Sequence, residues 1–203
     1  ADLSVRSTAA PFDPAPADPG ALASREGRIQ QEVLRRLAED GEVRGVGLGR
    51  SGLARYVPSA HDIVIEGSDP AAPTPDAARA AVDVNFFRGL RRPILEGRDF
   101  TTADVQDGPE AGPTPVIVNT SFVERVLGGR YAVGQRFRLA RAVEPESGFA
   151  WYEIVGVVGP FGMNPIHPAE DGGFYEPVRP GSSSSARFLV EVAGDPAAFA
   201  PRF

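Results

Sequence analysis

The sequence predicts an α+β fold made of two α/β subdomains, one of which is inserted into a β-α-β subdomain. Two proline-rich segments without hydrophobic periodicity, residues 11–20 and 68–76, separate groups of regular elements. A strand pattern returns late in the chain, at Arg187–Val192, and this strand needs a partner sheet. We expect that partner among the N-terminal strands, which makes the intervening chain an insertion.

The chain has 203 residues and 42% hydrophobic content, so it can bury a core and suits one domain or two small subdomains. We assign residues 1–75 and 180–203 to the discontinuous β-α-β subdomain. Residues 76–179 form the inserted α/β subdomain in this assignment. The second proline-rich segment marks the boundary between the two.

The first regular pattern after the N-terminal proline-rich segment is an amphipathic helix. Ser24 is its predicted N-cap, because a serine hydroxyl can accept a hydrogen bond from a free amide of the first turn. Ile29, Val33 and Leu37 recur at four-residue spacing, which places them on one helix face, and Gly41 ends the pattern. We therefore predict that this face packs on a sheet.

Short apolar runs predict the strands of both subdomains. In the β-α-β subdomain they lie near residues 3–7, 43–48 and 61–66. The inserted subdomain is expected to contain strands at 80–84, 116–118, 135–139 and Trp151–Val158, with a short helix at 85–90. A last helix should begin after Gly194-Asp-Pro196, since proline is favoured in the first turn.

Two capping patterns lie in the inserted subdomain. Asn119 ends a buried strand where a helix begins, and Ser121 and Glu124 have the spacing of a capping box. We expect the residues from 119 to 121 to satisfy free amides of that helix. A single capped helical turn is predicted at residues 101–104.

Composition excludes several classes of function. The net charge of −6 and the pI near 5.0 argue against nucleic-acid binding, which needs a concentrated basic face. Without cysteine, the chain can form neither disulfides nor thiolate metal sites. No apolar run reaches the ~18 residues that a membrane-spanning helix needs, and the N-terminus lacks the pattern of a signal peptide. If the chain works outside the cytoplasm, we expect its membrane segments to lie elsewhere in a longer protein.

The sequence offers no catalytic, cofactor-binding or metal-ligating constellation. Gly47-Leu-Gly-Arg-Ser-Gly52 matches a dinucleotide-binding pattern, but Pro58 and a strand follow where that chemistry requires a helix. His61 and His167 are the two histidines, and their spacing does not indicate a metal site. The serines at 182–185 lack the elbow motif that presents a nucleophile. We therefore predict a non-catalytic module that binds no cofactor.

The most apolar long loop of the chain is the candidate partner-contact site. It spans residues 161–175 and contains Phe161, Met163, Phe174 and Tyr175. Exposed apolar side chains on a loop held by rigid elements are typical of a contact surface. The alternative is a loop that folds onto its own core.

An ordered set of motifs resembles a known family. The motifs are Val84-Asn-Phe-Phe, Ile94-Leu-Glu-Gly-Arg-Asp-Phe-Thr101, Pro115-Val-Ile-Val-Asn119, Gly134-Gln-Arg-Phe137, Tyr152-Glu-Ile-Val-Gly-Val-Val-Gly159, Phe174-Tyr-Glu-Pro177 and 190–196. In this order they resemble the MacB-like periplasmic core domain of FtsX/MacB-type ABC transporter permeases. Within that family they are most similar to the large permeases that carry two such domains. The resemblance is close over residues 80–203 and looser before them.

The resemblance implies a porter-like β-α-β subdomain with an inserted Sabre-like subdomain, on the periplasmic side of a bacterial membrane. It implies a non-catalytic role in which permease motion is coupled to substrate or partner handling. The implied partners are other domains of the same permease, a second permease copy and a separate cytoplasmic ATPase, with membrane contact only through helices absent from this chain.

The alternative is a secreted or periplasmic α+β binding protein or hydrolase. The parent reading frame separates the two hypotheses. Several long apolar segments around this region would favour the permease, and a signal peptide alone would favour the alternative.

Overall fold

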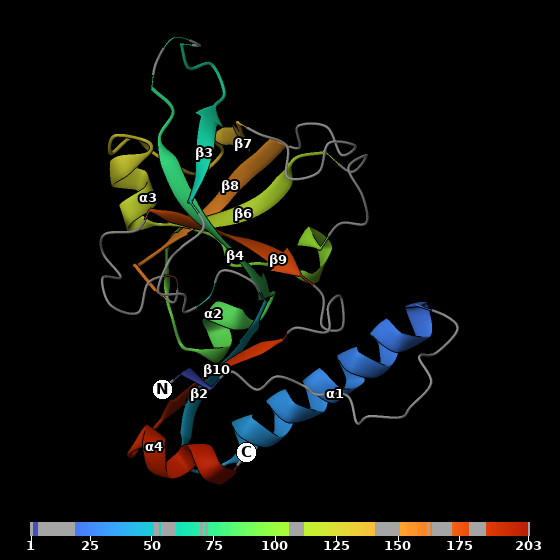
Figure 1. Cartoon of the computed structure of the whole chain (residues 1–203). Helices are drawn as coiled ribbons and strands as arrows, with labels where there is room; N and C mark the ends of the chain where they lie inside the picture. The colour runs from blue at the N-terminus through green and yellow to red at the C-terminus, as the bar shows by residue number, and fades with distance from the viewer. Residues whose placement is uncertain are drawn as a thin grey trace.

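The computed structural model describes residues 2–3, 19–50, 53, 60–69, 71, 73–105, 112–140, 151–161, 163, 172–178 and 186–202. They form an α+β fold, as the sequence predicts (Figure 1). The strands are β1 (Asp2–Leu3), β2 (Val43–Gly49), β3 (Ala60–Ile65), β4 (Asp76–Asp83), β5 (Ile94–Gly97), β6 (Thr114–Asn119), β7 (Arg136–Leu139), β8 (Trp151–Val158), β9 (Gly173–Val178) and β10 (Arg187–Val192). The helices are α1 (Pro19–Glu39), α2 (Phe86–Gly89), α3 (Thr120–Arg125) and α4 (Pro196–Phe199), with the 3-10 turns η1 (Thr102–Asp104) and η3 (Ala200–Arg202).

The lower part of the molecule in Figure 1 is a split β-α-β arrangement. We name it the terminal unit, and it comprises β1, α1, β2, β10, α4 and η3. β10 pairs antiparallel with both β1 and β2, so β1 and β2 run parallel with β10 between them. Leu37 of α1 and Phe199 of α4 are buried in one cluster with Val46 and Val190 of the sheet. The late strand therefore pairs with N-terminal strands, as its pattern predicts.

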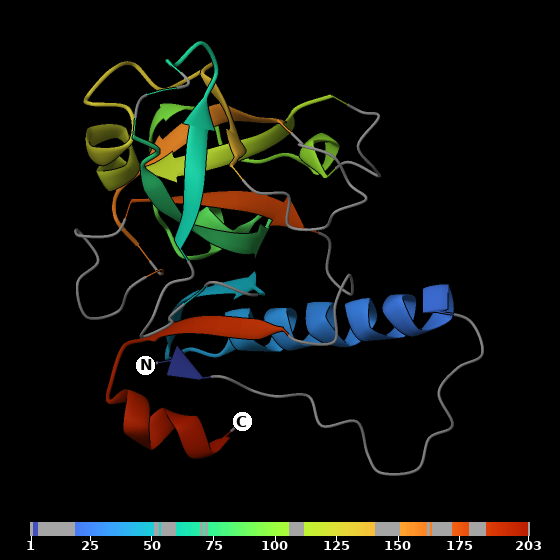
Figure 2. The same cartoon turned by 45° about the horizontal axis from the view of Figure 1, so that its top comes forward.

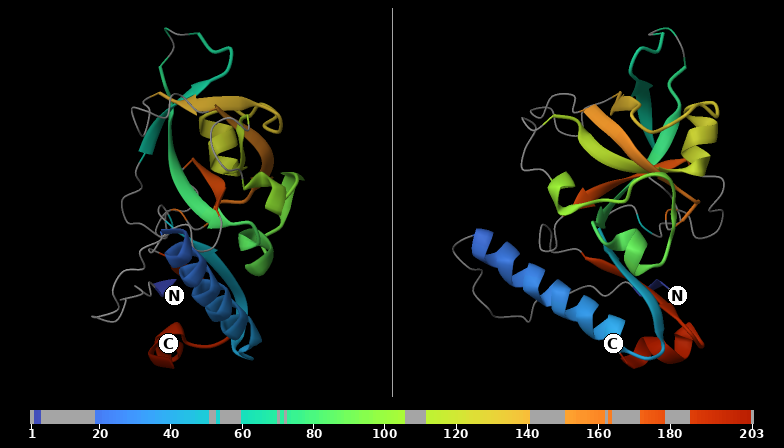
Figure 3. Two further views of the ribbon diagram at one scale, coloured as in Figure 1. Left: turned by 90° about the vertical axis from the view of Figure 1, so that its right-hand side faces the viewer. Right: turned by 180° about the vertical axis from the view of Figure 1, so that it is seen from behind.

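The upper part is a closed barrel of six strands. β4 pairs with β3, β3 with β7, β7 with β8, β8 with β6, β6 with β9, and β9 again with β4. Closure leaves none of these strands as a free sheet edge. We name this barrel, with α2, α3, β5 and η1, the barrel unit; the two views of Figure 3 show it above the terminal unit.

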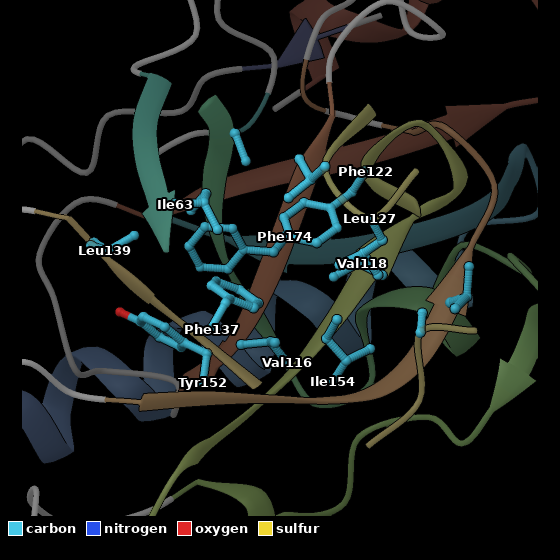
Figure 4. Packing of buried hydrophobic residues seen from close by; sticks show 14 residues of the cluster. Ile63, Val116, Val118, Phe122, Leu127, Phe137, Leu139, Tyr152, Ile154 and Phe174 are labelled. Carbon is cyan, nitrogen blue, oxygen red and sulfur yellow. The ribbon is translucent and has the colours of Figure 1, made fainter. Parts of the chain in front are cut away.

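Aromatic side chains fill the barrel interior (Figure 4). The rings of Phe137, Tyr152 and Phe174 lie with their centroids between 5.1 and 5.3 Å apart. They come from β7, β8 and β9, and Ile63 of β3 and Val116 of β6 belong to the same buried cluster. Inward and outward residues alternate along each strand, so one barrel buries two sets of apolar side chains.

Helix α3 closes one end of the barrel. Its N-cap is Asn119, whose side-chain oxygen accepts hydrogen bonds from the amide of Phe122 at 2.8 Å and that of Gly173 at 3.0 Å. One buried amide side chain thus joins the helix start to β9 and leaves Phe122 and Leu127 in the barrel core. Asn119 provides the cap, rather than the Ser121 pattern.

Charged side chains occupy the other end. Arg79 of β4 donates to both carboxylate oxygens of Glu176 of β9, at 3.1 and 2.8 Å. Burial and the nearby Arg79 lower the pKa of His61, and burial raises the pKa of Tyr152. The Arg79 and Glu176 side chains are only 26% and 16% exposed, so removing either partner would leave a partly buried charge unpaired.

The predicted capped turn at residues 101–104 is η1, and a capping box closes it. The Thr101 backbone amide and hydroxyl both donate to Asp104, at 2.7 and 2.9 Å. Arg98 holds both oxygens of the same carboxylate at 2.7 and 2.8 Å. Burial opposes ionisation of Asp104, but these hydrogen bonds outweigh it and lower the pKa. The turn is therefore fixed beside β5.

Helix α1 differs from the prediction at its start. It begins at Pro19 rather than after Ser24, because proline fits the first turn of a helix. Its 21 residues span about 31 Å, whereas the seven residues of β2 span about 24 Å. The helix consequently runs past the sheet, as Figure 2 shows, and Ile29 is 51% exposed rather than packed.

Strand β3 also has partners other than those expected. It lies within residues 1–75, yet its partners are β4 and β7 of the barrel unit and not β2. Ile63 needs the aromatic interior that β7, β8 and β9 supply, and this burial explains the pairing. The division at residue 76 stays a prediction, and the pairing of β3 favours a boundary between β2 and β3.

The two units meet where α2 lies on β2. Alternate residues Gly45, Gly47 and Gly49 present no side chain on this face of β2. A Cβ at Gly47 would lie 2.6 Å from atoms of Phe86 and Leu90. On the helix side, a Cβ at Gly89 would lie 2.2 Å from the carbonyl oxygen of Val46. The glycines on both sides therefore allow helix and strand to approach at backbone distance.

We predict that Gly89→Ala destabilises the protein by about 2–3 kcal/mol, as overpacking does in other cores. Alanine normally stabilises a helix relative to glycine, but here its methyl group would meet the Val46 carbonyl, which cannot move aside. Chemical denaturation measures the effect. Gly41→Ala is the matched control, because nothing lies within 4 Å of its added Cβ. Equal stability of the two variants would contradict the packing described.

We also predict that the protein becomes less stable as the pH decreases, and that His61 causes part of this loss. Burial and Arg79 lower its pKa in the folded protein, so the unfolded chain binds more protons once the pH drops below about 6.5. The free energy of unfolding should then decrease between about pH 7 and pH 5, and His61→Gln should reduce that decrease. Urea titrations at both pH values test this, and identical pH dependence in the two proteins would refute it.

Candidate functional site: the junction between the two units

The junction is the contact between β2 and β10 of the terminal unit and α2 with its following turn in the barrel unit. The chain crosses between the units twice, from β2 to β3 and from β9 to β10. The backbone pairing of β2 with β4 is short, since it consists of the pair Gly49 and Val82. Side chains and the α2 contact must therefore supply most of the remaining attachment.

The turn after α2 aims Arg92 at the terminal unit. Arg91 donates its amide to the Arg88 carbonyl at 3.1 Å, and Arg92 donates to the Phe87 carbonyl at 2.8 Å. This is a Schellman motif, in which the residue in the left-handed conformation is usually glycine. Here it is Arg91, with a φ of 53°, the one non-glycine residue with positive φ in the described chain. Such a residue costs about 1–2 kcal/mol, so neighbouring contacts must maintain it.

Arg92 makes contacts on both sides of the junction. Its guanidinium forms an ion pair with Glu191 of β10, and the two side chains are 38% and 36% exposed. The same guanidinium carbon lies 4.2 Å from the ring centroid of Phe161, within the range of a cation–π interaction. The Nε of Arg92 is buried without a hydrogen-bond partner. Arg92 is thus held by Glu191 on one side and by the Phe161 ring on the other, while its Nε has no hydrogen-bond partner.

Phe161 links this arginine to the barrel unit. Its carbonyl accepts a hydrogen bond from the Tyr175 hydroxyl, and its ring lies 6.2 Å from that of Phe86 on α2. Burial raises the pKa of Tyr175, so the phenol remains a donor at neutral pH. Phe161 is half-buried and belongs to the outer barrel cluster. Of the four residues of the predicted contact loop, it lies at the junction between units.

The other three candidate contact residues are part of the core, which agrees with the alternative of a loop folded onto its own core and not with a contact surface. Met163 is 2% exposed and lies against Gly173, where an added Cβ would be 2.0 Å from its sulfur. Phe174 points into the barrel, and Tyr175 points outward onto Phe87 at 5.0 Å. Their alternation along β9 explains this, because both faces of that strand are covered. The sequence showed their apolarity but not which faces were covered.

The opposite end of the junction is held by backbone groups. The amide of Arg50 donates to the Ala81 carbonyl at 2.8 Å, next to the pairing of Gly49 with Val82. Nearby, the Arg187 guanidinium donates to the Leu53 carbonyl at 2.6 Å. The junction is therefore held near Gly49 by hydrogen bonds to backbone carbonyls, and at Arg92 by contacts between side chains.

Hollows elsewhere on the described surface carry no reactive constellation. One of about 390 Å³ lies between β3 and the end of α3, and it includes Ile65, Val126 and Arg130 in its lining. A second, of about 280 Å³, lies beside His61 and Leu139 at the charged barrel end. Within the described ranges, no three histidine, aspartate or glutamate side chains converge as metal ligands would. His167 and the serines at 182–185 lie outside the described residues.

Reasoning from sequence missed the junction, although one signal pointed to it. Alternate glycines in a strand indicate that another backbone approaches closely, and Gly45, Gly47 and Gly49 follow this pattern. The glycines serve packing of α2 rather than phosphate binding, since Phe86 and Leu90 occupy the space above Gly47. The pairing of Arg92 with Glu191 leaves no comparable signal.

Comparison of the sequence with known protein families identifies one match. The sequence matches the MacB-like periplasmic core domain family over residues 8–198. Two similar solved structures are the extracellular domain of the noncanonic ABC-type transporter YknZ from Gram-positive bacteria and the periplasmic region of MacB from Actinobacillus actinomycetemcomitans. The first is 13% identical with a TM-score of 0.48, covering 81% of this chain and 73% of that one. The second is 10% identical with a TM-score of 0.48, covering 85% and 69%.

No curated protein matches the sequence. Among the described residues, no helix is both long and apolar enough to cross a membrane. The family match covers far more than half of the 203 residues and agrees with the family that the ordered motifs resemble. The chain therefore belongs to the MacB-like periplasmic core domain family and is an extracytoplasmic domain of an ABC transporter permease.

Proposed function

We propose that this domain couples movements of its permease to the handling of a substrate or partner protein outside the cytoplasm. In this proposal it catalyses no reaction itself. A separate cytoplasmic ATPase supplies the energy through the full-length protein. The domain acts by contact with other domains of the same permease and with a second permease copy.

The observation that carries this proposal is the position of the first and last described elements. β1 and η3 both lie in the terminal unit, in the lower part of the molecule in Figure 1. A displacement applied through either chain end reaches the terminal unit first. It then reaches the barrel unit through the junction and the two chain crossings. This arrangement suits a domain that transmits a displacement from the rest of the permease to the barrel unit.

The roles of the charged groups support a mechanical function. The paired Arg79 and Glu176 fill one barrel end, and Asp104 holds the η1 turn. Each of these groups already has partners that explain it as a structural element. A general acid or base needs a group free to exchange a proton with a substrate. The alternative of a binding protein or hydrolase has no such observation in its favour.

Hydrogen exchange of the full-length permease with its ATPase tests the proposal. We predict that a non-hydrolysable ATP analogue changes amide exchange in β2 and α2, although the nucleotide binds on the cytoplasmic side. The change should disappear with an ATPase variant that cannot bind nucleotide. Unchanged exchange throughout the domain would contradict coupling.

The isolated chain is the matched control for this experiment. Adding the same analogue to the 203-residue domain should leave every amide unchanged, because the proposal gives it no nucleotide site. A change in the isolated chain would show direct binding and would favour the alternative function.

A further inference from the structure

We propose that Arg92 is a releasable latch between the two units, and that the terminal unit rocks about the backbone contacts at Gly49 when the latch opens. This inference rests on the proposed coupling function for its biological purpose. Its physical claim concerns the domain alone. Three features of the junction support it: a hinge end, a latch end and a smooth surface between them.

The hinge end is held by hydrogen bonds to main-chain carbonyls. The Arg50 amide bonds to the Ala81 carbonyl at 2.8 Å, and Gly49 pairs with Val82. Arg187, which pairs with Gly49 across the terminal sheet, reaches the Leu53 carbonyl. A few main-chain bonds next to a glycine form a contact about which packed units can turn.

The latch end lies farther along the same strands. Glu191 pairs with Gly45, four residues from Gly49, so the ion pair with Arg92 lies about 13 Å from the hinge contacts along β2. A small rotation at Gly49 would therefore separate Arg92 from Glu191 first. In the closed arrangement seen here, the ring of Phe161 supports the guanidinium from the barrel side at 4.2 Å.

The surface between the two ends opposes opening only weakly. β2 presents Gly45 and Gly47 to α2, so opening withdraws no β2 side chain from a pocket. Phe86 and Leu90 lie against this flat backbone surface. Breaking such a contact loses dispersion and apolar burial, but it requires no repacking of interdigitated side chains.

The latch itself is suited to release. An ion pair exposed to this degree contributes little and is screened by salt. Closure also leaves the Arg92 Nε buried and unbonded, a penalty that hydration would remove on opening. This penalty opposes the closed state, so loss of the ion pair with Glu191 should be enough to open the latch.

Pulsed electron paramagnetic resonance on the 203-residue chain tests the latch. The chain has no cysteine, so Arg28→Cys on α1 and Glu124→Cys on α3 provide two labelling sites at exposed positions in different units. The parent protein should give one narrow distance distribution. Arg92→Gln should broaden it and add a second population, and 1 M sodium chloride should do the same to the parent. The charge swap R92E with E191R should restore the narrow distribution.

Arg136→Gln is the matched control, since Arg136 pairs with Glu153 at similar exposure but within the barrel unit. It should leave the distribution unchanged. A distribution that is the same for the parent and Arg92→Gln, and that salt does not alter, would overturn the latch. If Arg92→Gln fails to fold, the salt response and the charge swap still decide. A working latch combined with no nucleotide response in the full-length permease would refute the coupling function alone.

Discussion

The close approach of Gly89 to the Val46 carbonyl is the contact on which the arrangement of the two units depends. β2 is paired along one edge by β10, while its other edge pairs with β4 only near Gly49. α2 lies against β2 beside Gly45 and Gly47, and only a glycine on the helix fits against the Val46 carbonyl. Because α2 follows directly from β4, this contact places the barrel relative to the terminal sheet.

Barrel closure explains why the insertion can act as one body. Six strands pair in a ring, α3 closes one end through Asn119, and the Arg79–Glu176 pair fills the other. Side chains from all six strands pack together in the interior, so deformation of the barrel would disturb many contacts at once. The junction has glycines and partly exposed charges instead. When the Arg92–Glu191 ion pair opens, movement is therefore expected between the units and not within the barrel.

Local signals in the sequence predicted many of the regular elements, although β5 and β9 were not among the predicted strands. Trp151–Val158 and Arg187–Val192 have the predicted bounds, and Asn119 and Thr101 cap as expected, because strand alternation and capping depend on neighbouring residues. Contacts between distant segments were beyond such signals. Arg92 and Glu191 are 99 residues apart, and the burial of Met163 depends on where Gly173 lies. Ile29 fits the helix pattern yet is exposed, since periodicity does not reveal where the sheet beneath a helix ends.

The central claim is that two internally rigid units adopt one relative orientation through the α2–β2 contact. Residual dipolar couplings of backbone amides measure this most directly, because they report the orientation of every described element in one frame. The account predicts that a single alignment tensor fits β1, β2, β10 and α1 together with the six barrel strands. Separate tensors of different magnitude for the two units would contradict it, since the junction would then not hold them in one orientation.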